Sequence, residues 1–239
     1  MSLRRPSLPG TRLLEAGIHL RMLHDDRTGI LSYFLADTPS ARALLIDPQP
    51  PDLPVILALL EEFRCRSSWV CYTHSHLGPG PGAEPFMQSL RGRGIRVRRS
   101  ANAKSLAFGT DAIQVLPTPG HTVDCRSYLY RDRLFCGDLL YAGDCPAGAF
   151  PVEPGALWNS GRKVLFELPE ETLLYGAHLH HGRAVRLAFE EQRAHPWFSL
   201  HSRDAFLARI DRERVERAAA RAGLTSAGAM SGAPGAASI

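Results

Sequence analysis

The chain has 239 residues, of which 44% are hydrophobic and 22% are charged, a composition typical of a globular protein with one full-sized hydrophobic core. Its apolar runs fall short of the roughly 18 residues that cross a bilayer, so we expect no membrane-spanning helix. The net charge is +4, but the basic residues are scattered along the chain. We therefore expect neither nucleic acid nor a membrane surface as a partner.

The cysteines and the first residues of the chain predict a cytoplasmic location. The first ten residues contain charge but develop no apolar signal core, so we expect no export signal. The cysteines are odd in number and form no Cys-x-x-Cys pair, which favours reduced thiols over a disulfide framework. They are Cys65, Cys71, Cys125, Cys136 and Cys145.

Apolar runs separated by turn residues predict a mixed α/β domain. We expect strands over residues 18–23, 29–36, 43–47, 69–73, 94–98, 111–116, 127–130, 134–136 and 172–175. We expect helices over residues 53–63, 84–90, 156–168, 185–192 and 204–222. The domain is expected to cover residues 16–222, between a flexible lead-in over residues 1–15 and a disordered tail over residues 223–239.

Two histidines follow a buried strand and suggest a metal site. The apolar run that ends at Thr73 leads directly into His74-Ser-His76. In an extended segment, side chains two residues apart point to the same face, so both imidazoles could approach one ion. Two nearby histidines also occur in ordinary loops and cores, so this pair needs further ligands to support it.

Three more candidate ligands occur in the same context further along the chain. They are His121 in Pro-Gly-His-Thr, Asp138 in Gly-Asp, and His178 in Tyr-Gly-Ala-His. Each lies at or just beyond the end of a short apolar run. A fold that gathers strand ends at one edge would therefore bring all of them together with His74.

These motifs, in this order, resemble those of the metallo-β-lactamase superfamily, and within it the glyoxalase II and persulfide dioxygenase branch. The resemblance extends roughly from Ile18 to Ile210 and implies an αββα sandwich of two mixed sheets flanked by helices. The matching motifs are Leu-Ile-Asp47-Pro48, Thr73-His74-Ser-His76, Pro119-Gly-His121-Thr122, Gly137-Asp138 and Ala177-His178.

The sequence departs from the family at one ligand motif. The family pattern is His-x-His-x-Asp-His, but Gly78 and Pro79 stand here in place of the aspartate and the last histidine. In two-metal members those two residues help to hold the second ion. We therefore expect no dinuclear centre, and the substitution leaves open whether the site is active.

The resemblance to persulfide dioxygenases implies a single Fe(II) held by His74, His121 and Asp138, with Zn(II) as the alternative ion. In that case His76 and His178 are catalytic groups that orient ligands or handle protons. The substrate would be a small thiol-derived molecule.

The thiol carrier stays open, because the segment from Cys145 to Phe150 lacks the arginine and aspartate that the dioxygenase branch has after Gly-Asp. Arg183 and Arg186 could bind a substrate carboxylate, or they could be ordinary exposed helix residues.

Two other functions remain compatible with the sequence. One is a one-metal thioester hydrolase of the glyoxalase II type. The other is a non-catalytic protein that keeps the fold and a structural metal. The oligomeric state is also left open, a homodimer included.

Overall fold

The computed structural model describes residues 17–75, 83–99, 103–142, 151–180, 182–200 and 202–229. The predicted lead-in, His76, Gly78, Pro79, Cys145 and His181 lie outside these residues. Helix α5 (Arg203–Ala229) continues past residue 222, where the domain was predicted to end.

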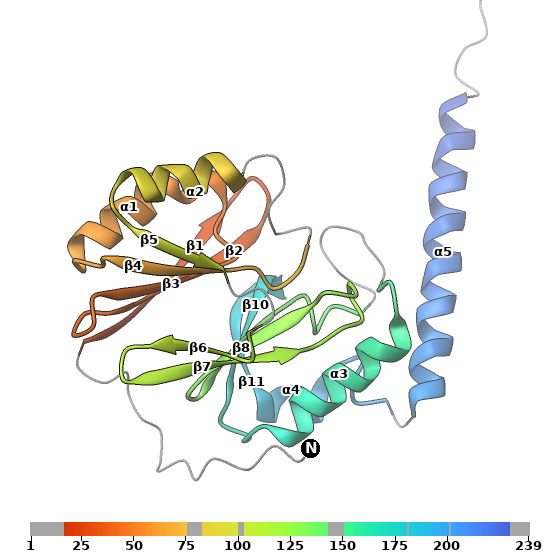
Figure 1. Ribbon diagram of the computed structural model, residues 1–239. Helices are drawn as coiled ribbons and strands as arrows, with labels where there is room; N and C mark the ends of the chain where they lie inside the picture. Colours follow the sequence, from red (N-terminus) through yellow and green to blue (C-terminus); the bar gives the residue numbers. More distant parts are fainter. Residues whose placement is uncertain are drawn as a thin grey trace, which may run out of the picture.

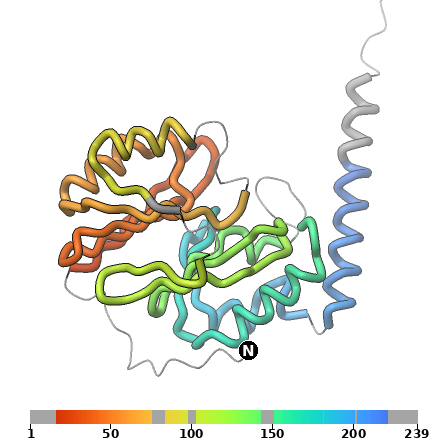
Figure 2. Tube along the Cα trace, viewed as in Figure 1, coloured from red at the N-terminus to blue at the C-terminus, as the bar shows by residue number. Residues whose placement is uncertain are grey.

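Eleven strands form one mixed sheet that curls into two facing layers (Figure 1). The first layer contains β1 to β5 and the second β6 to β11, so the chain completes one layer before it starts the other (Figure 2). The layers meet at β2 and β10, where Ile30 pairs with His178. The strands of the first layer are β1 (Ile18–Asp25), β2 (Ile30–Asp37), β3 (Arg42–Ile46), β4 (Ser67–Cys71) and β5 (Arg96–Arg99). Those of the second are β6 (Ser105–Phe108), β7 (Asp111–Pro117), β8 (Arg126–Tyr130), β9 (Arg133–Gly137), β10 (Leu173–His180) and β11 (Arg183–Leu187).

Helices cover the outer face of each layer (Figure 1). Helices α1 (Leu53–Glu62), which follows the short 3-10 helix Pro50–Asp52, and α2 (Ala83–Gly92) pack on the first layer. Helices α3 (Pro154–Glu167) and α4 (Ala188–Ala194) pack on the second. Helix α5 contacts α3 at its start and then extends away from the body. None of the described helices is both long and apolar enough to cross a membrane.

Strand β2 shows why the layers stack. It is buried on both faces: Tyr33 and Leu35 pack into the core between the layers, and Phe34 packs into the core beneath α1. Because successive side chains of a strand alternate between faces, a strand buried on both faces is largely apolar. Each fully buried side chain of this size contributes about 1.5–3 kcal/mol relative to exposure.

The architecture agrees with the αββα sandwich expected from the sequence, with two differences in the elements. The predicted helix over residues 185–192 begins three residues too early: residues 183–187 form β11, which pairs antiparallel with β10, and α4 begins at Ala188. The sequence alone did not predict β6, whose four residues alternate between exposed and buried. Both segments are too short for apolar spacing to distinguish a strand from a helix turn.

Candidate metal centre

Four predicted site residues lie where strands of both layers end. His74 follows β4, His121 follows β7, Asp138 follows β9 directly, and His178 lies near the end of β10. Strand β4 runs parallel to β3 and β5, and β9 runs parallel to β10. The carboxyl ends of parallel strands meet at one edge of a sheet, which places these side chains together.

Three imidazoles surround one oxygen of the Asp138 carboxylate. Atom Oδ2 of Asp138 lies 3.7 Å from Nε2 of His74, 3.7 Å from Nε2 of His121 and 3.8 Å from Nε2 of His178. The rings of His74 and His121 are 4.8 Å apart and nearly perpendicular. All four side chains are buried, each at most 6% exposed.

This donor set fits one divalent cation. The distances are too long for direct hydrogen bonds, but they suit ligands that each bind a shared ion at about 2.0–2.2 Å. Buried charges in proteins are paired or coordinate metals, and imidazole with carboxylate suits iron or zinc. His74, His121 and Asp138 can therefore hold an ion, with His178 close enough to be a fourth ligand or to act on a substrate beside it.

A buried hydrogen-bond chain sets the orientation of His74. The Asp47 carboxylate accepts hydrogen bonds from the backbone N–H of Thr73 at 2.7 Å and from its hydroxyl at 2.8 Å. The same hydroxyl oxygen lies 3.0 Å from Nδ1 of His74. When Asp47 is ionised it must accept the hydroxyl proton, so Thr73 Oγ1 accepts from Nδ1–H and Nε2 of His74 faces Asp138 as a lone pair. This geometry makes Asp47 a residue that orients His74 through Thr73 rather than a metal ligand.

Asp47 and Gly137 both adopt unusual conformations around Thr73. Asp47 has a φ of 50°, in the left-handed region that non-glycine residues rarely occupy. The pKa of Asp47 is raised to about 7: burial is the main cause and the nearby Asp138 carboxylate adds to it, while the two Thr73 hydrogen bonds oppose both effects. Gly137 has a φ of 56°, and a Cβ there would lie 2.5 Å from Thr73 Oγ1. Glycine is therefore required at this position in the Gly-Asp motif.

A backbone carbonyl group fixes the orientation of the His178 ring. Its Nδ1 lies 3.1 Å from the carbonyl oxygen of Gly29, a hydrogen-bond acceptor, so Nδ1 carries the proton and Nε2 faces Asp138. The sequence placed His178 in a loop after a strand ending at Tyr175, but the residue lies within β10 itself. The contact crosses from β10 to the turn before β2, so this ring bridges the two layers.

Cys125 joins the cluster in a way the sequence did not indicate. Ligand atoms of His74, His121 and Cys125 lie within 4.8 Å of one another. The Cys125 sulfur lies 3.9 Å from Nδ1 of His121 and 3.2 Å from the backbone nitrogen of Thr122. Burial raises the pKa of this thiol to about 11, so it is a neutral neighbour of His121 at physiological pH. From the sequence Cys125 is expected as a buried residue of a strand, but it lies in the loop before β8; its spacing of four residues from His121 was the available signal.

The two arginines considered for substrate binding are already engaged. Arg186 is buried, contacts His180 Nδ1 at 3.1 Å and lies 3.5 Å from the Glu191 carboxylate. Arg183 is exposed and forms an ion pair with Glu190 at 2.7 Å. Both lie on β11 and not on a helix, and these contacts leave Arg186 poorly placed to meet a substrate.

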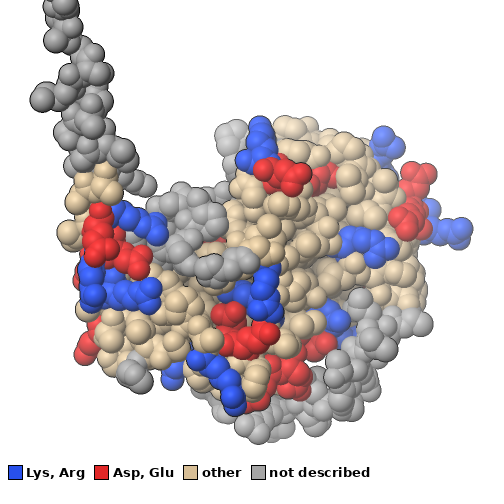
Figure 3. Space-filling model, turned by 180° about the vertical axis from the view of Figure 1, so that it is seen from behind, with Lys and Arg blue, Asp and Glu red and all other residues tan. Residues whose placement is uncertain are grey.

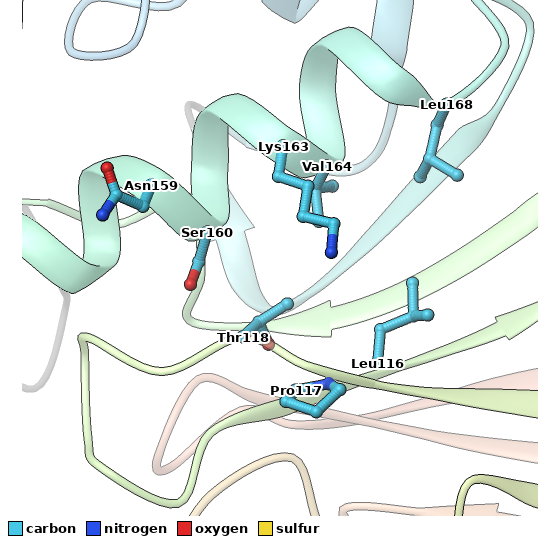
Figure 4. A pocket seen from close by; sticks show the side chains of 8 residues that line it. All are labelled: Leu116, Pro117, Thr118, Asn159, Ser160, Lys163, Val164 and Leu168. Carbon is cyan, nitrogen blue, oxygen red and sulfur yellow. The ribbon is translucent and has the colours of Figure 1, made fainter. Parts of the chain in front are cut away.

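A separate cavity lies between α3 and β7 (Figure 4). Its volume is about 160 Å³, below the roughly 300–1,000 Å³ typical of ligand sites, and none of the predicted site residues lines it. Its walls include Pro117 and Thr118, which precede the His121 loop, and Ser160, whose hydroxyl donates to the Pro119 carbonyl at 2.8 Å. The contact shows that α3 supports the His121 loop from behind.

Charged side chains are mixed on the visible surface. On the face shown in Figure 3, basic and acidic residues are interspersed, in keeping with the scattered pattern in the sequence. The expected absence of a nucleic-acid partner stays a prediction.

The chain is similar to proteins of a known family. The family described as "Metallo-beta-lactamase superfamily" matches residues 80–178. The mitochondrial persulfide dioxygenase ETHE1 of Homo sapiens is 30% identical over 200 residues, which cover 77% of this chain and 78% of the human protein. A hydroxyacylglutathione hydrolase of Shewanella baltica is 29% identical over 161 residues, which cover 61% of this chain and 60% of that protein.

A solved structure extends the likeness to three dimensions. The crystal structure of ETHE1 from Myxococcus xanthus superimposes with a TM-score of 0.65 at 30% sequence identity. The match covers 81% of this chain and 90% of that one. The likeness therefore extends over most of both chains.

Proposed function

Because the chain belongs to the metallo-β-lactamase superfamily, we propose that it is a mononuclear, metal-dependent oxidoreductase of the persulfide dioxygenase type. Its substrate is the persulfide of a low-molecular-weight thiol. The metal is Fe(II), held by His74, His121 and Asp138, and His76 and His178 are the catalytic side chains. The protein is cytoplasmic.

The convergence of two imidazoles on one buried carboxylate oxygen carries this proposal. Two histidines and one carboxylate are the ligand set of many non-haem iron oxygenases, because they leave coordination positions for both a substrate and O₂. When bound, the iron would bring the terminal sulfur of the persulfide and O₂ together. The 30% identity to a persulfide dioxygenase over most of both chains supports this choice among the reactions of the superfamily.

The chain's own residues then have three tasks. Thr73, held by Asp47, keeps the Nε2 lone pair of His74 directed at the metal position. The turn that follows β9 presents the Asp138 carboxylate. His178, with Nδ1 bound to the Gly29 carbonyl, directs Nε2 into the site as the atom that can hold a proton.

Proton handling matters because the overall reaction releases protons. One persulfide R–S–SH, one O₂ and one water give the thiol R–SH, one sulfite and two protons. The sulfur–sulfur bond breaks, and the terminal sulfur is oxidised while O₂ is reduced. A base within the site therefore assists turnover, and His178 is the described side chain placed for this role.

The test measures metal content and O₂ uptake on the same preparation. We expect one equivalent of iron and consumption of O₂ with persulfides of glutathione or cysteine, accompanied by equimolar sulfite. His121→Ala should lose both metal and O₂ uptake. The matched control is His24→Ala, which removes a histidine outside the site, and it should retain both. An iron-loaded protein that consumes no O₂ with any persulfide would refute the proposal.

A second candidate is a one-metal thioester hydrolase of the glyoxalase II type. It is favoured by the third imidazole, since His178 Nε2 lies 3.8 Å from the same carboxylate oxygen and three histidines with one carboxylate also suit Zn(II). Gly78 and Pro79 weaken it, because neither offers a side-chain ligand for a second ion. Cleavage of a hydroxyacyl thioester of glutathione by the zinc-loaded protein, without O₂ uptake, would favour this function.

The remaining alternative is a non-catalytic member of the superfamily. A protein that binds neither iron nor zinc, and that neither ion stabilises against unfolding, would support it.

A further inference from the structure

The Asp138 carboxylate is presented by a short turn after β9. The backbone N–H of Leu139 donates to the Cys136 carbonyl at 3.1 Å, and that of Tyr141 donates to the Asp138 carbonyl at 3.0 Å. These bonds lie within the turn, and the side chains of Leu139 and Leu140 pack into the core beneath α3. Any drift of the turn would move the carboxylate away from the three imidazoles.

Side-chain hydrogen bonds of Tyr141 and His195 also join this turn to other elements. The Tyr141 hydroxyl donates to the His178 carbonyl at 2.7 Å, and Nε2 of His195 lies 3.1 Å from the Leu140 carbonyl. His195 follows α4 and is 55 residues away in sequence from Leu140, so the second contact joins elements far apart in the chain. Its side chain is 1% exposed.

The hydrogen bonds of His195 select one tautomer. Its Nδ1 accepts from the backbone N–H groups of Trp197 at 3.1 Å and Phe198 at 3.3 Å. A nitrogen that accepts two backbone N–H groups carries no proton, so the ring proton lies on Nε2. His195 Nε2–H therefore donates to the Leu140 carbonyl, two residues from Asp138.

Glu191 is a charged neighbour of His195, and its carboxylate lies between that ring and Arg186. The Glu191 carboxylate lies 3.7 Å from His195 Nε2, and the guanidinium of Arg186 lies 3.5 Å from the same carboxylate oxygen. The positive partner of Glu191 is thus the arginine, which also contacts His180 from the other side. On its faces, His195 contacts Phe198 with ring centroids 4.9 Å apart and His180 in parallel at 6.2 Å.

We propose that His195 is a positioning residue. As a neutral donor it holds the Leu140 carbonyl in place, which we call the His195 clamp, and it thereby keeps the Asp138 carboxylate close to the three imidazoles. Its catalytic importance rests on the proposed function of the site. The clamp itself is a property of the fold and can be measured without turnover.

The test compares two variants that separate the two ends of the ring. In His195→Gln, the longer side chain places an amide N–H₂ near the position of Nε2 and keeps the donor to Leu140. In His195→Asn, the shorter side chain can still accept from Trp197 but cannot reach Leu140. Both replace the imidazole by an uncharged amide, so each controls for the other, and neither leaves a large cavity.

The first readout is amide hydrogen exchange in metal-free protein. In His195→Asn, the Tyr141 amide should exchange about tenfold or more faster, because the turn opens locally, while His195→Gln stays close to wild type. The Val115 amide, which donates to Lys104 in the second layer, serves as the internal reference and should not change.

The second readout is metal affinity by chelator competition. We expect about a 10–100-fold loss in His195→Asn and restoration in His195→Gln. Equal exchange rates and equal affinities in the two variants would overturn the clamp. If the wild type bound no metal while the exchange difference persisted, the proposed function would fail and the clamp would stand.

Discussion

Replacing Thr73 by valine tests the hydrogen-bond chain behind His74. Valine has nearly the same shape as threonine but no hydroxyl, and Thr73 is 2% exposed, so water cannot easily replace the lost bonds. The variant deprives the Asp47 carboxylate of a donor at 2.8 Å and His74 Nδ1 of a partner at 3.0 Å. At pH 8 the cost is greatest, because the Asp47 pKa is about 7 and the carboxyl is then ionised.

The magnitude follows from the two bonds. A hydrogen bond to a charged group contributes about 1.5–3 kcal/mol and a neutral one about 1 kcal/mol, so we expect a loss of about 3 kcal/mol in the free energy of unfolding. For a domain of this size that corresponds to a fall in Tm of roughly 6–12 °C. Below pH 6 the loss of unfolding free energy in Thr73→Val should be smaller. Asp47 is then protonated and uncharged, so removing one hydrogen-bond donor from it destabilises the fold less.

Urea unfolding of metal-free protein at pH 5.5 and pH 8 measures both quantities. The matched control is Thr118→Val, which removes an equally buried hydroxyl whose partner, at 3.0 Å, is the neutral hydroxyl of Ser127. The control should lose only about 1 kcal/mol, equally at both pH values. The reasoning is refuted if Thr73→Val loses no more than the control, or loses the same amount at both pH values.

Three further predictions concern other groups of the chain. His178→Ala should keep metal affinity within about tenfold of wild type yet lose turnover, because His178 is assigned to proton handling; metal release equal to that of His121→Ala would make it a ligand instead. The stability of metal-free protein should fall as pH rises from about 4 to 7: the raised Asp47 pKa means that the folded state holds its proton more tightly, so this contribution is complete below the unfolded value of 3.8 and lost through about 7. Asp47→Asn should flatten the slope measured by urea unfolding across that range, and equal slopes would contradict the assignment. In Cys145→Ser protein, a thiol reagent at pH 8 should find no reactive group before denaturation and four afterwards, since Cys65, Cys71, Cys125 and Cys136 are buried and burial raises the thiol pKa of Cys65, Cys125 and Cys136 to about 11, 11 and 12; early reaction of any of them would be inconsistent with this packing.

The architecture was largely predictable because its signals are local and strong. The helical stripe over residues 53–63 is α1, and the apolar runs around residues 30–46 are two-sided buried strands of the first layer. The segment over residues 183–192 was not predictable, because its strand exists only through pairing with Leu174 and Tyr175 in β10. The β-propensity of a short segment cannot reveal its pairing with a strand that lies elsewhere in the chain.

In the candidate site, the possible metal ligands could be predicted from the sequence, but the residues that support them could not. His74, His121 and Asp138 follow strand ends in short motifs, so their convergence could be anticipated from the sequence. The supporting residues could not: Thr73 and Asp47 are 26 residues apart, and His195 acts on a carbonyl 55 residues away. Such partners are set by how the layers and helices pack, and a lone threonine or histidine carries no sign of it in the sequence.

The cluster of four side chains lies between the two layers of the sandwich, and a bound ion would therefore connect them. Among the four converging side chains, only His74 belongs to the first layer, and the other three belong to the second. A cation held there would link the two layers, because its ligands would come from both. Its binding free energy would add to the work needed to part the layers, so loss of the ion would loosen the whole sandwich along this line.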